Sequence, residues 1–363
     1  MAEIAPARDR ITAFDVARGV GLVGMVTIHV VYHWASPTAW TGLPALVLGV
    51  AGGPLAMPVV TLLLGASLAF SRRTSRRQLA ARGLGFLAGA FLLNLARGTV
   101  PLALARSAGV APAGTDEYSV WGLAIAVDVL ALAGMTLLAV ALLGPLLRRP
   151  AVSIALAVLV VLAAPILRPL APADPVPAAL AGLLFATGPT DYYPVFPWAG
   201  FALLGMSYGQ AVRRGPADAA IARWGVGGAL VALVGGAVLA RDLPAAIGVA
   251  WYWEMPPALA LAVAGTVLAW IAASDRVVRL AGETAPLRLL ATWGRRTTRI
   301  YVTHWPIVAW GVGLVGFRTL DGPASVIAIG AVLVATHLGA AASYRIAPAA
   351  GVARKTGTQA AEP

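Results

Sequence analysis

Apolar stretches long enough to cross a lipid bilayer dominate this sequence. A membrane-spanning helix needs about 20 mostly apolar residues to cross about 30 Å of hydrocarbon. Ten such stretches lie between charged residues and turn signals, at 14–34, 45–70, 79–97, 120–147, 151–168, 193–212, 221–240, 255–273, 299–317 and 324–343. Only 12% of the 363 residues are charged, against about 25% in an average soluble domain. We therefore predict an all-α polytopic integral membrane protein with about ten transmembrane helices.

The basic residues predict how these spans are oriented, because Lys and Arg concentrate in cytoplasmic loops. With the N-terminus in the cytoplasm, 22 of the 27 basic residues fall on the cytoplasmic side. The five on the other side are Arg97, Arg106, Arg168, Arg241 and Arg318. Ten spans then place both termini in the cytoplasm. We predict one transmembrane domain at 1–345 and a cytoplasmic, disordered tail at 346–363.

The net charge of +12 is explained by this topology and by attraction to anionic lipid, rather than by nucleic acid. The bias towards Ala and Arg, with a single Lys, indicates a bacterial source of high GC content and hence a plasma membrane. The chain contains no cysteine, which excludes disulfides, cysteine metal ligands and a cysteine nucleophile.

Polar residues inside the spans are the candidates for function, because an ionisable group in a membrane is costly. They are few: Asp15, Arg18, His29, His33, Asp128, His304 and His337, with the neutral Asn94. No partner for Asp128 is evident from the sequence. We treat His337 as structural.

The first span carries the richest polar set. Arg18 and His29 are 11 residues apart, which is close to three helical turns and about 16 Å along the axis. Both therefore lie on one face, and Asp15, one turn before Arg18, is placed to pair with it. His33 lies one turn beyond His29. The two histidines are spaced like a metal pair, but no third ligand is evident, so we expect no metal.

Several motifs occur in a characteristic order along the chain. They are Arg10-Ile-x-x-Phe-Asp-x-x-Arg-Gly19, Met57-Pro-Val-Val60 with Gly65-Ala-Ser67, Asp191-Tyr-Tyr-Pro-Val-Phe-Pro-Trp198, and Gly294-Arg-Arg-Thr-Thr-Arg-Ile-Tyr-Val-Thr-His-Trp-Pro306. Together they resemble the heparan-alpha-glucosaminide N-acetyltransferase catalytic-domain family, within the membrane-bound acyltransferase superfamily. The Arg18 and His29 pair is also similar to the Arg/His signature of the acyltransferase-3 proteins.

The resemblance implies acyl transfer across a membrane. Such proteins take an acyl group, usually acetyl from acetyl-CoA at the cytoplasmic face, and deliver it to a sugar amine or hydroxyl on the far side. Arginine suits the phosphates of CoA because it binds them in a bidentate way. We expect Arg18, Arg295 and Arg299, together with the neighbouring Arg296, to bind the donor. His304 is expected to orient the donor or a catalytic partner.

Acyl transfer needs a base for the proton of the acceptor or a nucleophile that holds the acyl group. Histidine suits either role near neutral pH. In the heparan family the catalytic His precedes a Trp-Asn-Gly-Leu segment, and here His33 precedes Trp40-Thr-Gly-Leu43 with altered spacing. His29 is preferred and His33 stays open, with Asp15 and Asp128 as the carboxylates of the catalytic group. Direct transfer and an acyl-His intermediate also both stay open.

The acceptor site is expected on the outer side. Its candidates are Asp191, Tyr192, Trp198 and Asn94, although the aromatic residues would equally suit an interfacial belt. The alternative function is a transporter of a small solute or a lipid-linked intermediate. A transporter commonly shows repeated halves, which this sequence lacks. An enzyme should instead bring Arg18, His29, Asp128 and His304 around one site.

Overall fold

The computed structural model describes residues 11–71, 75–112, 115–116, 118–172, 174–186, 188, 190–242, 249–282 and 284–346. Over these residues the chain is helical, and strand-like pairing is limited to two isolated bridges, Ala35 with Leu320 and Val127 with Asp191. The predicted all-α class is confirmed. The expected tail beyond Ile346 lies outside the described residues, as do Arg8, Arg10, Arg72, Arg73, Arg354 and Lys355.

The helices follow one another closely along the chain. They are α1 (Thr12–Trp34), α2 (Gly42–Gly52), α3 (Met57–Leu68), α4 (Arg76–Asn94), α5 (Val100–Ser107), α6 (Val120–Ala124), α7 (Val129–Leu147), α8 (Pro150–Leu167), α9 (Pro175–Leu184), α10 (Val195–Arg214), α11 (Ala217–Asp242), α12 (Val249–Glu254), α13 (Pro257–Ala281), α14 (Ala285–Arg295), α15 (Thr297–Val315) and α16 (Gly322–Ile346). A π-helical turn, Leu95–Thr99, joins α4 to α5.

Eight helical segments in the described part of the chain are long and apolar enough to cross a membrane. They are Thr12–Trp34, Gly42–Leu68, Arg76–Ser107, Val129–Leu147, Pro150–Leu170, Ala217–Ala240, Pro257–Ala281 and Gly322–Ser343. Large apolar side chains on them are exposed, such as Leu142 and Ile166, and a surface of this kind is suited to lipid rather than water. The chain is an integral membrane protein.

The other two expected spans are also helical, as α10 and α15. Both are long enough to cross a bilayer but are less apolar than the eight. Most of α10 is buried against other helices, and a helix surrounded by protein does not need an apolar surface all round. Ten crossings, the cytoplasmic position of both termini and the single-domain boundary at residue 345 stay predictions.

The second span is broken just before Pro58. The helix ends at Gly52 and restarts at Met57. Proline is well tolerated in the first turn of a helix, where its missing N–H would have no intrahelical acceptor. The break therefore falls immediately before the proline.

The fourth span is shorter than predicted. The expected helix over 120–147 is interrupted after Ala124, and α7 begins only at Val129. Asp128 has extended backbone and its side chain accepts hydrogen bonds from the N–H groups of Leu130 and Ala131. Aspartate favours this capping position over a helix interior, so Asp128 stands at a helix start and not in mid-helix.

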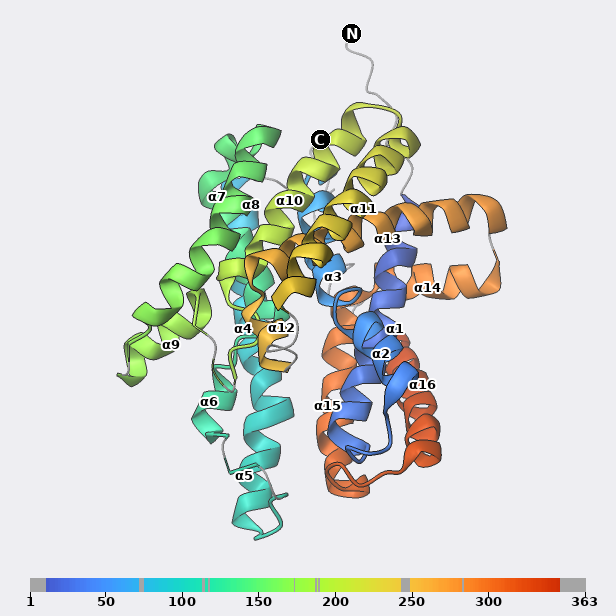
Figure 1. The fold of residues 1–363 in the computed structure, drawn as a ribbon. Coiled ribbons are helices and arrows are strands. Elements are labelled where there is room, and N and C mark those ends of the chain that lie inside the picture. The colour runs from blue at the N-terminus through green and yellow to red at the C-terminus, as the bar shows by residue number, and fades with distance from the viewer. Residues whose placement is uncertain are drawn as a thin grey trace, which may run out of the picture.

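Helix α1 is central to the arrangement and contacts α2, α3, α13, α14, α15 and α16 (Figure 1). Its closest approach to α14 depends on glycine. A Cβ atom on Gly19 would lie 2.0 Å from the Leu290 carbonyl oxygen, and one on Gly294 would lie 1.9 Å from that of Asp15. These contacts bring the arginine-rich start of α15 beside Arg18.

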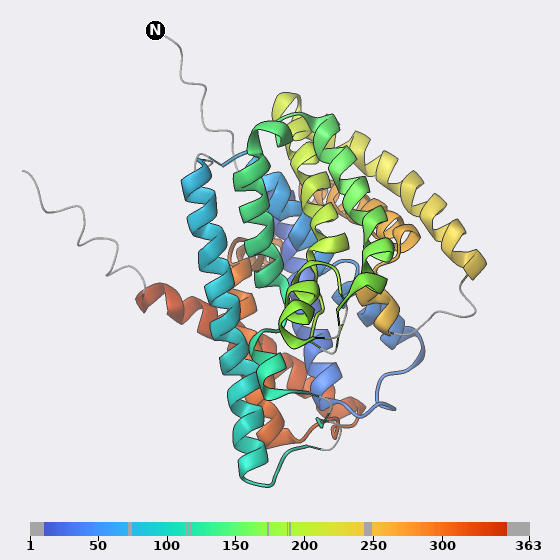
Figure 2. The ribbon, with the colours of Figure 1, turned by 90° about the vertical axis from the view of Figure 1, so that its left-hand side faces the viewer.

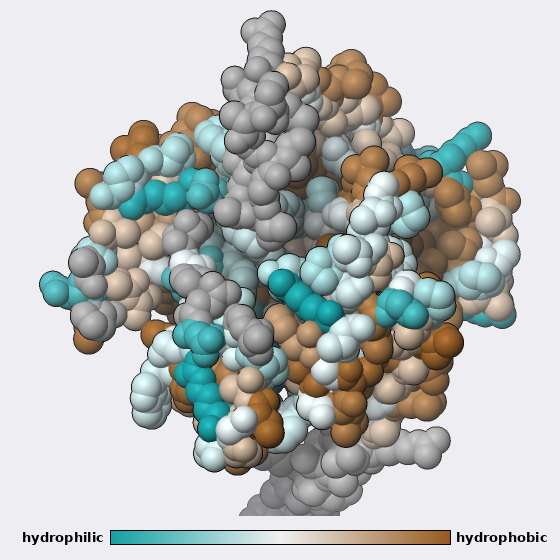
Figure 3. Space-filling view, turned by 60° about the horizontal axis from the view of Figure 1, so that its bottom comes forward, coloured by the Kyte–Doolittle hydropathy of each residue, from teal (hydrophilic) through white to brown (hydrophobic). Residues whose placement is uncertain are grey.

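The two ends of the molecule are more polar than its flanks. In Figure 2, α4 and α5 form one long rod, and the start of α4, the α7–α8 turn and the end of α10 lie at the same upper end. The pairs Arg148-Arg149 and Arg213-Arg214 occur at that turn and that helix end. Figure 3 brings the opposite end forward, and hydrophilic residues gather there between hydrophobic flanks.

Candidate active site

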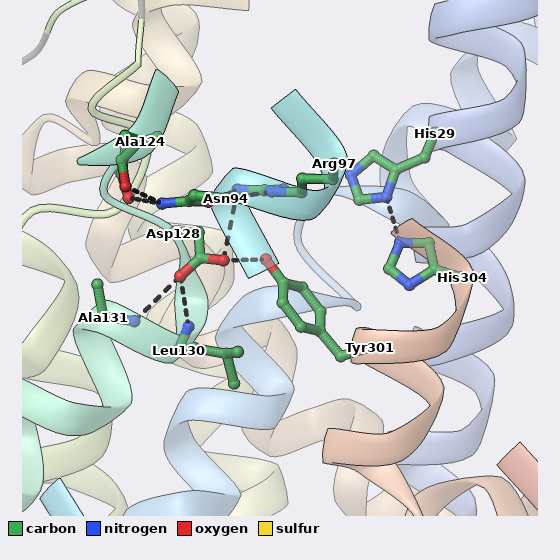
Figure 4. A network of polar contacts seen from close by, with 10 residues as sticks. His29, Asn94, Arg97, Ala124, Asp128, Leu130, Ala131, Tyr301 and His304 are labelled. Atoms are coloured by element: carbon green, nitrogen blue, oxygen red, sulfur yellow. Dashed lines mark hydrogen bonds and ion pairs between the residues drawn. The ribbon is translucent and has the colours of Figure 1, made fainter. Parts of the chain in front are cut away.

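Two histidines meet in the interior, one from α1 and one from α15. The Nδ1 atom of His29 lies 3.0 Å from Nε2 of His304 (Figure 4). The two rings are stacked, and the Trp305 ring packs against His29 with its centroid 4.2 Å away. His304 is fully buried, whereas His29 is partly exposed. The site therefore contains one fully buried histidine and one that is partly buried.

A second polar cluster is centred on Asp128. Its carboxylate accepts a hydrogen bond of 2.9 Å from the Tyr301 hydroxyl and lies 3.4 Å from Nη2 of Arg97 (Figure 4). Asn94 accepts two hydrogen bonds from Arg97 and donates to the Ala126 carbonyl at 2.8 Å. The cluster ties α4 and α15 to the linker in front of α7.

The two clusters are joined through α15. Tyr301 lies one turn before His304, and their ring centroids are 5.6 Å apart. Cζ of Arg97 lies 4.3 Å from the centroid of the Trp305 ring, the ring that also contacts His29. Such a position over an aromatic face stabilises a guanidinium. The histidine pair and the Asp128 cluster thus form one continuous polar region.

A cavity of about 500 Å³ approaches this region from α1, α3, α4, α7, α14 and α15. Five arginines line it: Arg18, Arg82, Arg295, Arg296 and Arg299. Met25 and Tyr301 line it too, four residues before His29 and three before His304. Each offset is about one helical turn, or about 5.4 Å along the axis. The arginine-lined space therefore reaches to within one turn of the histidine pair.

A known protein family matches this chain. The sequence profile of "Heparan-alpha-glucosaminide N-acetyltransferase, catalytic" matches residues 10–236, which is more than half of the chain. The chain belongs to this family. Membership in the heparan-alpha-glucosaminide N-acetyltransferase family gives it acyltransferase activity in general terms. No curated protein matches it. The match includes His29, Arg97 and Asp128, whereas His304 and the arginines of α14 and α15 come from the part after it.

For this family member, the predicted donor residues do come together. Arg18, Arg295 and Arg299 line one cavity. The predicted pairing of Arg18 with Asp15 is confirmed at 3.6 Å. Asp15 lies fourteen residues before His29 on the same helix, about 21 Å along the axis, so the structure groups it with the arginines and not with the histidines.

The structure distinguishes the two candidate histidines of the first span. His29 contacts His304, as described above. His33 lies among the rings of Tyr32, Trp305 and Phe317, and its imidazole makes no hydrogen bond within the described residues. Within the described residues, the imidazole of His29 is therefore hydrogen-bonded, whereas that of His33 has contacts with aromatic rings. No three His, Asp or Glu side chains in the described ranges gather as metal ligands would.

Two of the predicted acceptor residues, Asp191 and Tyr192, lie beside the linker that carries Asp128. The backbone N–H of Tyr192 donates to the Val127 carbonyl at 3.1 Å, so the segment from Asp191 runs beside the linker. Burial raises the pKa of the Asp191 carboxyl to about 6. Tyr192 packs its ring on Trp253.

Trp198, in contrast, is 0% exposed and donates its indole N–H to the Trp253 carbonyl at 3.2 Å. Its indole ring packs against the rings of Tyr193, Phe201 and Tyr252 in an aromatic cluster. Asn94 is also buried, with the partners given above. Trp198 and Asn94 are therefore buried residues that support the structure of the site.

Three residues of the site had no predicted functional role: Arg82, Arg97 and Tyr301. The sequence indicates Arg97 and Arg82 only as basic residues that report topology, and Tyr301 stands in a motif without an assigned role. The side chain of Arg97 is only 10% exposed. The sequence does contain a signal for Arg97. It is a basic residue on the extracytoplasmic side, where few basic residues are expected, and it follows the polar residue Asn94 by three positions.

Proposed function

We propose that this chain transfers an acyl group, most simply acetyl, from acyl-CoA to a hydroxyl or amine of a sugar-like acceptor. The donor binds in the arginine-lined cavity from the cytoplasmic side of a bacterial plasma membrane. The acceptor approaches from the opposite side. The observation that carries the proposal is the cavity itself, because its arginines lead to within one helical turn of a histidine pair.

The charge of the cavity suits the donor. CoA carries several phosphate charges, and a guanidinium binds phosphate through paired N–H donors. Five arginines from α1, α4, α14 and α15 converge on a space of about 500 Å³, a volume typical of small-molecule sites. A CoA molecule with its phosphates among these arginines would direct its thioester towards Met25 and Tyr301.

The histidine pair suits the chemistry. In the proposed reaction His29 takes the proton of the acceptor, or itself accepts the acyl group before passing it on. The segment of Asp191 and Tyr192 lies beside Asp128 and offers a carboxyl and an aromatic ring to a sugar. The acceptor is proposed as sugar-like on this basis and on that of the family.

The test uses protein purified in detergent, with acetyl-CoA as the donor probe. We expect saturable binding of acetyl-CoA and slow release of CoA by the unaltered chain. His29→Ala should lose turnover by at least about 100-fold while it still binds acetyl-CoA. His33→Ala should keep most of the turnover, and His337→Ala serves as the control because His337 lies outside the site.

Three results would contradict the proposal or part of it. Normal turnover by His29→Ala would remove its catalytic assignment, and loss in His33→Ala alone would transfer that role to His33. An unaltered chain that neither binds acetyl-CoA nor releases CoA would favour transport of a solute instead.

A further inference from the structure

A short chain of hydrogen bonds runs from the backbone of α15 to His29. Nδ1 of His304 lies 3.1 Å from the carbonyl oxygen of Ile300, one turn earlier in the same helix. Nε2 of the same ring lies 3.0 Å from Nδ1 of His29. Each imidazole nitrogen of His304 therefore has one defined partner.

The chemistry of these partners assigns the hydrogen atoms. A carbonyl oxygen can only accept, so Nδ1 of His304 must carry a hydrogen. A neutral imidazole carries one N–H, which leaves a lone pair on Nε2 of His304. The hydrogen between the two rings must then belong to Nδ1 of His29. The lone pair of His29 is then on its Nε2 atom.

The opposite assignment requires a charged His304. A doubly protonated ring would donate from Nε2 to His29, and His29 would then carry its hydrogen on the far nitrogen. His304 is 0% exposed, and no carboxylate forms a hydrogen bond with it within the described residues. An unpaired cation buried in this way is strongly disfavoured. The neutral assignment is therefore the one that the surroundings support.

We infer that His304 is a positioning residue that fixes the tautomer of His29, so that Nε2 of His29 is the reacting atom. This inference rests on the proposed function for the role of His29. In Figure 4 that second nitrogen of His29 is turned away from His304, towards the side on which Arg97 lies. Free histidine in water favours hydrogen on Nε2, so without His304 the lone pair would face α15 instead.

The reaction step follows from the position of the lone pair. As the acceptor oxygen or nitrogen forms a bond to the thioester carbon, its proton passes to Nε2 of His29. The carbon–sulfur bond breaks, the electron pair leaves on sulfur, and the proton moves from Nε2 to the thiolate. The products are the acylated acceptor and CoA. An acyl-His route would use the same atom, because Nε2 is the nitrogen with the free electron pair.

Two variants of His304 separate positioning from packing. His304→Gln supplies an amide oxygen that can accept the same hydrogen bond, whereas His304→Leu fills the space with no acceptor. We expect His304→Leu to lower kcat by about 10²- to 10⁴-fold, a range that includes the loss seen when a general base is held in the wrong tautomer. KM for acetyl-CoA should stay within about twofold. His304→Gln should retain activity within about tenfold, and His337→Gln should have no effect.

A spectroscopic measurement tests the tautomer directly. The chain contains only four histidines, so 15N-histidine labelling with single-site variants assigns each ring. We expect a protonated Nδ1 on His29 in the unaltered protein and in His304→Gln, and a protonated Nε2 in His304→Leu. A protonated Nε2 in the unaltered protein would overturn the inference, as would full activity of His304→Leu.

The two proposals fail in distinguishable ways. If the unaltered chain transfers no acyl group, the proposed function is wrong, while the spectrum of His29 still decides its tautomer. If His304→Leu does not fold, the unaltered protein and His304→Gln carry the test.

Discussion

At the scale of single residues, the Asp128 carboxylate combines two functions that usually belong to different side chains. It accepts hydrogen bonds from two N–H groups at the start of α7, and it also contacts Tyr301 and Arg97. Asp128 is 1% exposed. An Asn at this position could still cap the helix, but it would leave the Arg97 guanidinium without its counter-charge.

We therefore predict that Asp128→Asn destabilises the protein by about 2 kcal/mol, the usual worth of a hydrogen bond to a charged group. The apparent melting temperature in detergent should fall by about 5 °C. The matched control is Asp321→Asn. Asp321 caps α16 through the Ala324 N–H in an exposed position, and its melting temperature should not change. Equal melting temperatures for both variants would show that the charge of Asp128 has no structural role.

Asp191 gives a second prediction at this scale. Burial raises the pKa of its carboxyl from 3.8 to about 6, so the folded protein holds this proton more tightly than the unfolded chain. The free energy of unfolding from this group is then highest below pH 4 and falls as the pH rises through about 6. The melting temperature of the unaltered chain should therefore fall relative to that of Asp191→Asn over that window, and the difference should stay constant above it. A difference independent of pH between 3.5 and 7 would contradict the prediction.

At the scale of elements, close helix packing through glycine decides where the cavity wall lies. Helices α3 and α10 cross in contact: a Cβ atom on Gly205 would lie 1.9 Å from the Leu62 carbonyl oxygen, and one on Gly209 would lie 2.4 Å from that of Ala66. Small residues four apart allow this approach in membranes. Since Val60, Thr61 and other residues of α3 line the cavity, the contact also sets its width.

We predict that Gly205→Ala separates α3 from α10, with a loss of about 1–3 kcal/mol and weaker binding of acetyl-CoA. The control is Gly85→Ala on α4, where an added Cβ meets no atom within 4 Å. That change should be neutral or slightly stabilising, because alanine is the better helix former. Melting temperature and acetyl-CoA affinity of the two variants decide the matter. Unchanged values for Gly205→Ala would mean that the helices can part without cost.

At the scale of the whole molecule, residues far apart in sequence form each part of the site. The cavity combines Arg18 of α1 and Arg82 of α4 with arginines from the α14–α15 junction. His29 and His304 are 275 residues apart. The site therefore exists only when both halves of the chain have folded around α1.

The arginines give a prediction at this scale. Arg82→Gln should weaken acetyl-CoA binding by about tenfold, equivalent to about 1.4 kcal/mol, as one phosphate contact is lost. Arg148→Gln removes the same charge from an exposed turn outside the cavity and should leave the affinity unchanged. Binding isotherms with acetyl-CoA and with a donor lacking phosphates measure both. Equal losses of affinity in the two variants would mean that the arginines attract anions in general and that Arg82 makes no specific phosphate contact.

Local patterns were sufficient to predict the helices, the membrane class and the family. Each of the ten predicted apolar runs contains helix, and eight helical segments of the described chain are long and apolar enough to cross a membrane. The spacing of Arg18 and His29 placed both on one stripe of α1. The predicted fourth span is too long, because the helix-capping residue Asp128 lies within its apolar run. The contacts of Arg97 and Tyr301 with Asp128 could not be predicted, since Asp128 is distant from both in the sequence.

Hydropathy and helical periodicity are properties of neighbouring residues, and the sequence by itself therefore determined that this chain enters a membrane as helices with a polar stripe on the first. Only the tertiary structure decided that His304 faces His29, that Asp128 meets Arg97 and Tyr301, and that five arginines share one cavity. These contacts depend on how closely helices approach at glycines such as Gly19 and Gly294. That approach is set by packing between backbones distant in sequence, which no local pattern records.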